Sequence, residues 1–206
     1  MRSQINLIRH GITVGNKNRL FYGASDIELA PEGIEALKEQ AEAGLYPSAE
    51  NSDFYTSGMK RTEHTLELIY GEREHEIISE FREVNCGIYE MKSFSELKGN
   101  EAFEAWLADS TGQTTPEGGE SIVDFNVRVQ EGFRKLTGKH RLKELSVRHN
   151  GKPAVSTVVC HGGVICAILQ ECFPGKYDNF FKWMPDPGHG YTLTMEDGEI
   201  VGYEKF

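Results

Sequence analysis

Two short apolar segments, each ending on a histidine followed by glycine, constrain this chain most. Residues 5–8 read Ile-Asn-Leu-Ile and stop at Arg9-His10-Gly11, while residues 154–160 read Ala-Val-Ser-Thr-Val-Val-Cys and stop at His161-Gly162-Gly163. Runs of this length, rich in branched residues, are typical of strands buried within a parallel sheet. Because open α/β sheets bind ligands at the carboxyl ends of their strands, both histidines are expected at one edge.

The residues at this edge suit a particular kind of ligand. A guanidinium beside an imidazole, with Gly11 allowing close approach of the backbone, favours an anionic phosphoryl group. Arg-His-Gly alone is a weak motif, and the second histidine segment is what makes the prediction specific.

Length and charge limit the alternatives. The 206 residues suit a single domain spanning 1–206. The formal charge of −10 argues against nucleic acid or an acidic membrane as partner. No apolar stretch approaches the roughly 18–20 residues of a membrane span. The N-terminus leads straight into the first strand, so no signal peptide is expected.

The cysteines indicate neither a metal site nor disulfides. Cys86, Cys160, Cys166 and Cys172 show no C-x-x-C pair or other zinc spacing. The last three lie in apolar surroundings and are expected to be reduced thiols of the core. A cytoplasmic location is the corresponding expectation.

Alternating strand and helix signals predict an α/β fold: a three-layer sandwich with a mostly parallel central sheet and helices on both faces. A strand is expected over 52–56, and a closing hairpin at 191–195 and 199–203 with an Asp-Gly turn. Helices are expected over 31–43, 59–70, 121–136 and 164–172. Residues 85–119 interrupt the alternation and predict an inserted lid with one short helix over 95–107.

Several separate segments resemble, in order and spacing, the histidine phosphatase superfamily, the phosphoglycerate mutase-like proteins. The resemblance covers nearly the whole chain. Its segments are Arg9-His10-Gly11, Asn16 with Phe21-Tyr22-Gly23-Ala24-Ser25-Asp26, Ser57-Gly58-Met59-Lys60-Arg61-Thr62 with Thr65, Phe81-Arg82-Glu83, Pro116-Glu117-Gly118-Gly119-Glu120-Ser121 and Val159-Cys160-His161-Gly162-Gly163.

This resemblance implies the roles of the site residues. His10 would be the nucleophile that forms a phosphohistidine, and Glu83 the proton donor to the leaving group. Nearby cations should discourage protonation of His10 and keep it nucleophilic. The phosphoryl oxygens would be bound by Arg9, Arg61 and His161. Further substrate contacts are expected from Asn16, Gly23 and Gly162. The family pattern uses no metal or cofactor.

Some residues have competing interpretations. Glu90 is an alternative proton donor, although a solvated lid residue is the favoured interpretation because the family acid aligns with Glu83. His189 is left open as a residue at the pocket rim. The remaining histidines, His64, His75, His140 and His149, are expected to be solvated.

The predicted activity is that of a phosphomonoester hydrolase acting on a small phosphorylated metabolite. A phosphoglycerate mutase is the alternative, but no Arg-Arg pair follows residues 85–91, and Lys92 and Lys98 are the lid's only cations. A larger basic lid would be expected for a regulator acting on a sugar bisphosphate. A non-enzymatic phospho-ligand binder is disfavoured because the site is complete. The lid is similar to that of the α-ribazole phosphatase-like branch. Whether the chain forms a homodimer is left open.

Overall fold

A computed structural model describes residues 2–147 and 151–206 and has a six-stranded sheet at its centre, with strand order β4-β3-β6-β1-β7-β8. The strands are β1 (Arg2–Arg9), β3 (Ser52–Thr56), β4 (His75–Ile77), β6 (Val155–Cys160), β7 (Gly190–Glu196) and β8 (Glu199–Lys205). Strands β4, β3, β6 and β1 are parallel, while β7 is antiparallel to both of its neighbours. The mostly parallel sheet and its closing hairpin are therefore confirmed.

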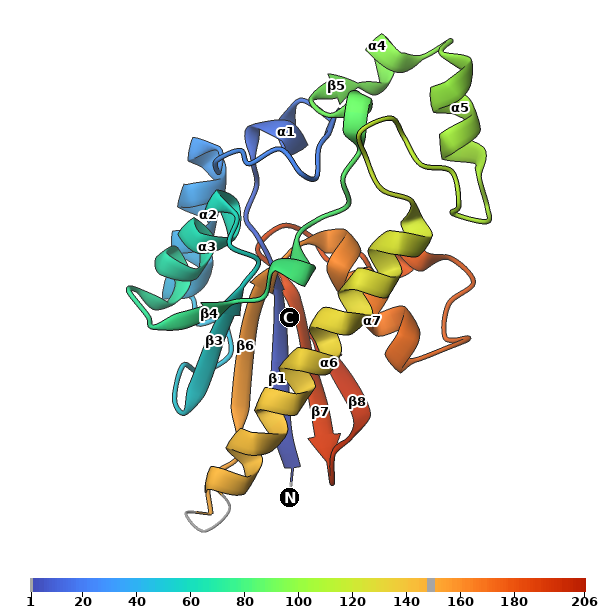
Figure 1. The fold of residues 1–206 in the computed structure, drawn as a ribbon. Coiled ribbons are helices and arrows are strands. Elements are labelled where there is room, and N and C mark those ends of the chain that lie inside the picture. The colour runs from blue at the N-terminus through green and yellow to red at the C-terminus, as the bar shows by residue number, and fades with distance from the viewer. Residues whose placement is uncertain (1, 148–150) are drawn as a thin grey trace.

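The two histidine-bearing strands lie side by side at the centre of this sheet. Leu7 of β1 pairs with Val158 of β6, and Arg9 pairs with Cys160. Every residue of β6 is buried, including Ser156 and Thr157, as expected for a strand inside a parallel sheet. Because the paired strands are parallel and in register, the residues that follow them emerge at one edge (Figure 1).

Helices cover both faces of the sheet, so the three-layer sandwich is confirmed. On one face, α6 (Ile122–Val147) and α7 (Gly162–Cys172) pack with Ile5 and Leu7 of β1. The other face has α2 (Pro31–Glu42) and α3 (Lys60–Tyr70), whose Leu66 packs with Ile8 and Val159. Alternate residues of β1 thus enter different cores, as strand geometry requires.

Helix α6 continues well beyond the predicted end at Leu136, and this corrects two expectations. Leu136 and His140 are both fully buried, one helical turn apart. Nδ1 of His140 lies 2.9 Å from Oγ of Ser156, and Nε2 lies 2.8 Å from Oγ of Ser3. The prediction of a solvated His140 was wrong because hydroxyls from two strands satisfy the ring within the core. His149 lies outside the described residues.

The 85–119 region differs from the expected single helix. It contains β5 (Lys92–Ser93), α4 (Phe94–Leu97) and α5 (Glu101–Ala108), and the two helices are separated by Gly99 with φ +86°. Such a positive φ favours glycine and ends a helix. The pair lies above the carboxyl ends of the sheet strands (Figure 1). Its function as a lid stays a prediction.

The segment after β1 contains short regular elements. These are α1 (Val14–Lys17) and β2 (Leu20–Phe21), and β2 pairs antiparallel with β5. Three-residue helices η1 (Ser79–Phe81) and η2 (Gly87–Tyr89) follow β4, and η4 (Phe180–Trp183) precedes β7. In the described parts of the chain, no helix is both long and apolar enough to cross a membrane.

Candidate active site

The rings of His10 and His161 meet at the carboxyl edge of the sheet. Their centroids are 5.2 Å apart at an interplanar angle of 63°. His10 is 3% exposed and His161 is fully buried. The sequence prediction that two distant segments bring their imidazoles together is therefore matched by the geometry.

A backbone carbonyl fixes the tautomer of His10. Nδ1 lies 2.8 Å from the carbonyl oxygen of Gly11, which can only accept, so Nδ1 carries the proton. Burial, and then the charge of Arg61, hold the pKa of His10 well below its usual range. The imidazole is therefore neutral, and Nε2 presents a lone pair. These are the properties required of a nitrogen nucleophile.

Arg61 is fully buried at the start of α3. Its Nη2 donates to the carbonyl of Gly23 at 2.7 Å, and its Nη1 to that of Ser25 at 2.8 Å. Its Nε donates to Nδ1 of His161 at 3.2 Å. The Tyr22 ring lies 5.2 Å from the guanidinium carbon. These contacts fix the plane of the guanidinium, and no carboxylate within residues 2–147 and 151–206 is bonded to it, which is a suitable arrangement for binding an anion.

Hydrogen-bond directions also define the state of His161. Its Nδ1 accepts from Arg61, so Nε2 carries the proton and donates to Oγ of Ser57 at 2.8 Å. Burial, and then Arg61, hold the pKa of His161 well below its usual range. Both ring nitrogens are thus paired within the protein. To donate to a phosphoryl oxygen, as predicted, His161 would have to redirect its Nε2 proton from Ser57 or gain a proton at Nδ1.

Arg9 has an unused donor at the site. Its Nη1 donates to the carbonyl of Pro185 at 2.7 Å, whereas its buried Nε has no hydrogen-bond partner among the residues that the structure describes. Buried donors are rarely left unpaired in proteins. A cationic donor in this position, on the residue preceding His10, fits an anion that supplies the acceptor.

Glu83 reaches the first turn of α7. One carboxylate oxygen accepts from the backbone nitrogen of Gly163 at 2.9 Å, and the other from that of Val84 at 3.0 Å. A Cβ on Gly163 would lie 2.4 Å from that carboxylate, so only glycine permits this approach. The helix therefore carries both His161, its N-cap residue, and the contact that orients the predicted acid.

Glu90 is neither solvated nor arranged as a proton donor. It accepts hydrogen bonds from the backbone nitrogens of Gly23, Ala24, Ser25 and Cys86 and from the Ser25 hydroxyl. Burial opposes ionisation, but these bonds together lower the pKa of Glu90. The favoured interpretation of Glu90 as a solvated residue was therefore wrong, because backbone donors from two segments surround its carboxylate.

The predicted substrate-binding residues occupy different positions. Oδ1 of Asn16 accepts from the backbone nitrogen and hydroxyl of Thr13, which leaves the NH₂ end for a ligand. Gly162 is the first residue of α7, and a Cβ there would lie 3.2 Å from Nε of Arg9. Gly23 uses its N–H on Glu90 and its carbonyl on Arg61, so the structure makes it a support for Arg61.

The other histidines have partners elsewhere. The ring nitrogens of His189 lie 3.2 Å from the Phe206 carbonyl and 3.2 Å from the Gln40 amide, so its ring is directed towards the C-terminus and α2. Nε2 of His75 lies 2.7 Å from Glu63, and His64 is half-buried on α3.

Sequence reasoning assigned no role to several hydroxyls that support the site. Oγ of Ser57 accepts the hydrogen bond from Nε2 of His161, and Oγ1 of Thr65 accepts one from the backbone nitrogen of Gly11 at 3.0 Å. Thr65 also donates to the Arg61 carbonyl at 2.7 Å. Polar residues on the buried face of the 59–70 helix were the available signal, because that face is otherwise expected to be apolar.

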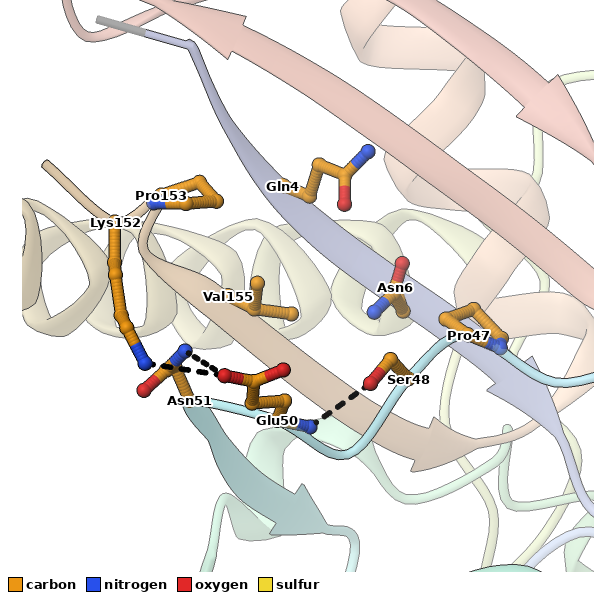
Figure 2. Close-up of a pocket in the computed structure, with 9 residues that line it drawn as sticks. All are labelled: Gln4, Asn6, Pro47, Ser48, Glu50, Asn51, Lys152, Pro153 and Val155. Atoms are coloured by element: carbon orange, nitrogen blue, oxygen red, sulfur yellow. Dashed lines mark hydrogen bonds and ion pairs between the residues drawn. The ribbon is translucent and has the colours of Figure 1, made fainter.

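A separate cavity of 280 Å³ lies at the opposite end of β1 and β6 (Figure 2). Its lining residues are Gln4, Asn6, Pro47, Ser48, Glu50, Asn51, Lys152, Pro153 and Val155. Its two charged groups, Glu50 and Lys152, pair with each other at 3.1 Å. Its described lining residues include no histidine and no unpaired cation, so these residues lack the chemistry found at the carboxyl edge. Within residues 2–147 and 151–206, no group of three or more His, Cys, Asp or Glu side chains could hold a metal ion.

The fold, with two neutral histidines and two arginines at the carboxyl edge of its sheet, agrees with comparisons to known proteins. The family model of the histidine phosphatase superfamily (branch 1) matches residues 5–202, and the chain belongs to this family. The adenosylcobalamin/alpha-ribazole phosphatase of Escherichia coli K12 is 31% identical over 153 residues, which cover 70% of this chain and 72% of that protein.

Mutases are also among the relatives. A probable phosphoglycerate mutase of Proteus mirabilis is 32% identical over 172 residues, covering 81% of this chain and 73% of that protein.

The crystal structure of a putative alpha-ribazole-5'-P phosphatase from Escherichia coli superposes with a TM-score of 0.79, covering 99% of this chain and 94% of that chain. At 22% identity, this structural likeness concerns the fold.

Proposed function

We propose that this protein is a phosphomonoester hydrolase that acts on a small phosphorylated metabolite through a phosphohistidine on His10. The observation that carries the proposal is the Nδ1 hydrogen bond of His10 to the Gly11 carbonyl. It leaves Nε2 as the nucleophile in a site that also contains Arg61 and the unpaired Nε of Arg9. Both cations would stabilise charge on the transferring phosphoryl group.

The two half-reactions divide between His10 and Glu83. Nε2 of His10 attacks phosphorus, and the bond to the ester oxygen breaks while Glu83 donates a proton to that oxygen. Glu83, now ionised, then takes a proton from water as the water oxygen attacks the phosphohistidine. Inorganic phosphate is released, and both residues return to their starting states. Loss of one oxyanion donor in such a site typically costs about 10²–10³ in rate.

The phosphatase proposal is favoured over a mutase by the composition of the 85–119 region. Its only cations are Lys92 and Lys98, against the six carboxylates of Glu90, Glu96, Glu101, Glu104, Asp109 and Glu117. A mutase must bind a phosphoglycerate carboxylate and retain its intermediate, whereas a phosphatase admits water. The mutase relatives make isomerisation of phosphoglycerate the second candidate.

The first experiment is turnover of p-nitrophenyl phosphate without added metal by wild type and His10→Ala. Wild-type turnover, inhibition by vanadate and an inactive variant are expected. Activity that survives in His10→Ala would contradict the proposal. Labelling by ³²P-labelled substrate should give an acid-labile, base-stable adduct. A panel of phosphorylated metabolites, with 3-phosphoglycerate and 2,3-bisphosphoglycerate included, separates hydrolysis from isomerisation.

A further inference from the structure

The carboxylate of Glu90 connects two segments of the candidate site. Its oxygens accept from the backbone nitrogens of Gly23, Ala24 and Ser25 at 3.0–3.1 Å and from the Ser25 hydroxyl at 2.6 Å. We propose that Glu90 is a positioning residue which, by holding this 23–25 loop, fixes Arg61 in the geometry that binds the phosphoryl group. The role of Arg61 in this inference rests on the proposed function.

The N–H groups and the carbonyl groups of the 23–25 loop bind side chains of opposite charge. Its N–H groups point to Glu90, while the carbonyls of Gly23 and Ser25 accept from the two terminal nitrogens of Arg61. A carboxylate and a guanidinium therefore bind the same short stretch of backbone from its two sides. Hydrogen bonds connected in this way strengthen one another. Because Arg61 is fully buried, these carbonyls determine the plane of its guanidinium.

Glu90 also connects this loop to the segment that follows the predicted acid. It accepts from the backbone nitrogen of Cys86 at 2.9 Å, three residues after Glu83. The two segments are in close contact, since a Cβ on Gly23 would lie 1.6 Å from the Val84 carbonyl oxygen. One side chain thus holds the loop that orients Arg61 against the segment that carries Glu83.

The hydrogen-bonding pattern defines which substitution is informative. All donors that converge on Glu90 require an acceptor, and an ionised carboxylate provides acceptor sites on both oxygens. In Glu90→Gln, one oxygen becomes an NH₂ group that faces backbone N–H groups. The side-chain size is preserved while part of the attachment is lost, and the Gly23 and Ser25 carbonyls can then move away from Arg61.

The test is binding of inorganic phosphate, measured by titration calorimetry, which does not depend on turnover. We expect Glu90→Gln to weaken phosphate binding roughly 10- to 100-fold, the range for members of one hydrogen-bonded network. In an Arg61→Lys background, where a single ammonium replaces the two-carbonyl contact, Glu90→Gln should add less than about twofold. This lack of additivity is a result that general destabilisation would not produce.

Two further variants provide a control and a second way of displacing the 23–25 loop. Asp109→Asn removes a carboxylate that accepts from Thr111 and Thr114 in the same region, away from the 23–25 loop. It should bind phosphate as wild type does. Gly23→Ala forces the loop away from the Val84 carbonyl while Glu90 stays intact, and it should weaken phosphate binding as Glu90→Gln does. If Glu90→Gln does not fold, Gly23→Ala is measured in the wild-type and the Arg61→Lys backgrounds, and the same lack of additivity is expected.

The proposal is overturned if Glu90→Gln binds phosphate as tightly as wild type does. It is equally overturned if the losses from Glu90→Gln and Arg61→Lys multiply in the double variant. A wild-type protein that binds phosphate but hydrolyses no phosphomonoester would refute the proposed function alone, because the binding comparison would still report on Glu90.

Discussion

Nε2 of His140 lies 2.8 Å from the hydroxyl of Ser3, which itself donates to Glu144 at 2.5 Å. Ser3 has one proton and uses it on the carboxylate, so His140 donates from Nε2 and accepts at Nδ1 from Ser156. Burial lowers the pKa of His140. The folded protein therefore holds this ring neutral while joining α6 to two strands.

This relationship predicts how stability depends on pH. The unfolded chain binds a proton at His140 near pH 6.5, and the folded chain binds it only at a lower pH. The free energy of unfolding should therefore fall as pH decreases below about 6.5. Urea denaturation at pH 7.5, 6.5 and 5.5 measures this, and His140→Gln should show a smaller decrease. His10 and His161 add in the same direction, because their pKa values are also lowered by burial. A wild-type free energy of unfolding that rises as the pH is lowered from 7.5 to 5.5 would contradict the assignment of neutral rings.

Ser57→Ala tests the support of His161. The substitution leaves the Nε2 proton of His161 buried without an acceptor, a loss that costs about 1–3 kcal/mol. We expect kcat/KM for p-nitrophenyl phosphate to fall about 5- to 150-fold, the factor that corresponds to this energy. Ser79→Ala, on the exposed η1 turn, is the control and should leave kcat/KM unchanged. Equal values for the two variants would show that the Ser57 contact has no effect on the reaction.

Gly163→Ala tests the position of Glu83. Its Cβ would enter the space of the carboxylate, so Glu83 must move away from the leaving group. Leaving groups with high pKa need protonation most, so turnover of an alkyl phosphate should fall further than that of p-nitrophenyl phosphate. Gly138→Ala, on the exposed face of α6 with no atom within 4 Å of its Cβ, should keep the wild-type ratio of the two rates. A uniform loss on both substrates in Gly163→Ala would remove Glu83 from the protonation step.

Phe103→Ala tests the packing of the 85–119 region. Phe103 is fully buried, with ring centroids of Phe21 and Tyr89 both 5.1 Å away. Its truncation should destabilise the fold by about 3–5 kcal/mol if the cluster unfolds with the sheet. Phe94→Ala is the matched control, since Phe94 is 54% exposed. A single denaturation transition that shifts for Phe103→Ala and not for Phe94→Ala would support one cooperative unit; an unchanged main transition would indicate that this region unfolds separately.

Strands β1, β3, β6, β7 and β8 were predictable from short runs rich in branched and aromatic residues, and the two central strands end where histidine and glycine follow. The patterns of β1 and β6 predicted that His10 and His161 lie together. Strand β4 was not expected, because its three residues, His-Glu-Ile, form no apolar run. The full length of α6 was missed because its second half exposes most of its surface and buries His140 through hydroxyls that no local pattern reveals. The break between α4 and α5 was missed because it depends on the positive φ of Gly99, which the residue type alone does not determine.

The supporting contacts of the site were the least predictable part. The Gly11 carbonyl and the Gly23 and Ser25 carbonyls are backbone groups, whose directions depend on tertiary packing and not on residue type. Glu90 resembles a surface carboxylate in sequence, since its bonds come mainly from a loop far away in the chain. The roles assigned to Arg9, His10, Arg61, Glu83 and His161 stay predictions until the variants are measured.

The central position of β1 has a consequence for biosynthesis. This strand is synthesised long before the two strands that hydrogen-bond to it, because β6 begins at Val155 and β7 at Gly190. A ribosome-bound fragment that ends before β6 therefore contains His10 but lacks the neighbouring strands that place this residue at the edge of the sheet. Such long-range pairing slows folding and leaves apolar segments exposed meanwhile. Premature termination before β6 should yield products that can neither bind an anion nor protect their first strand from aggregation.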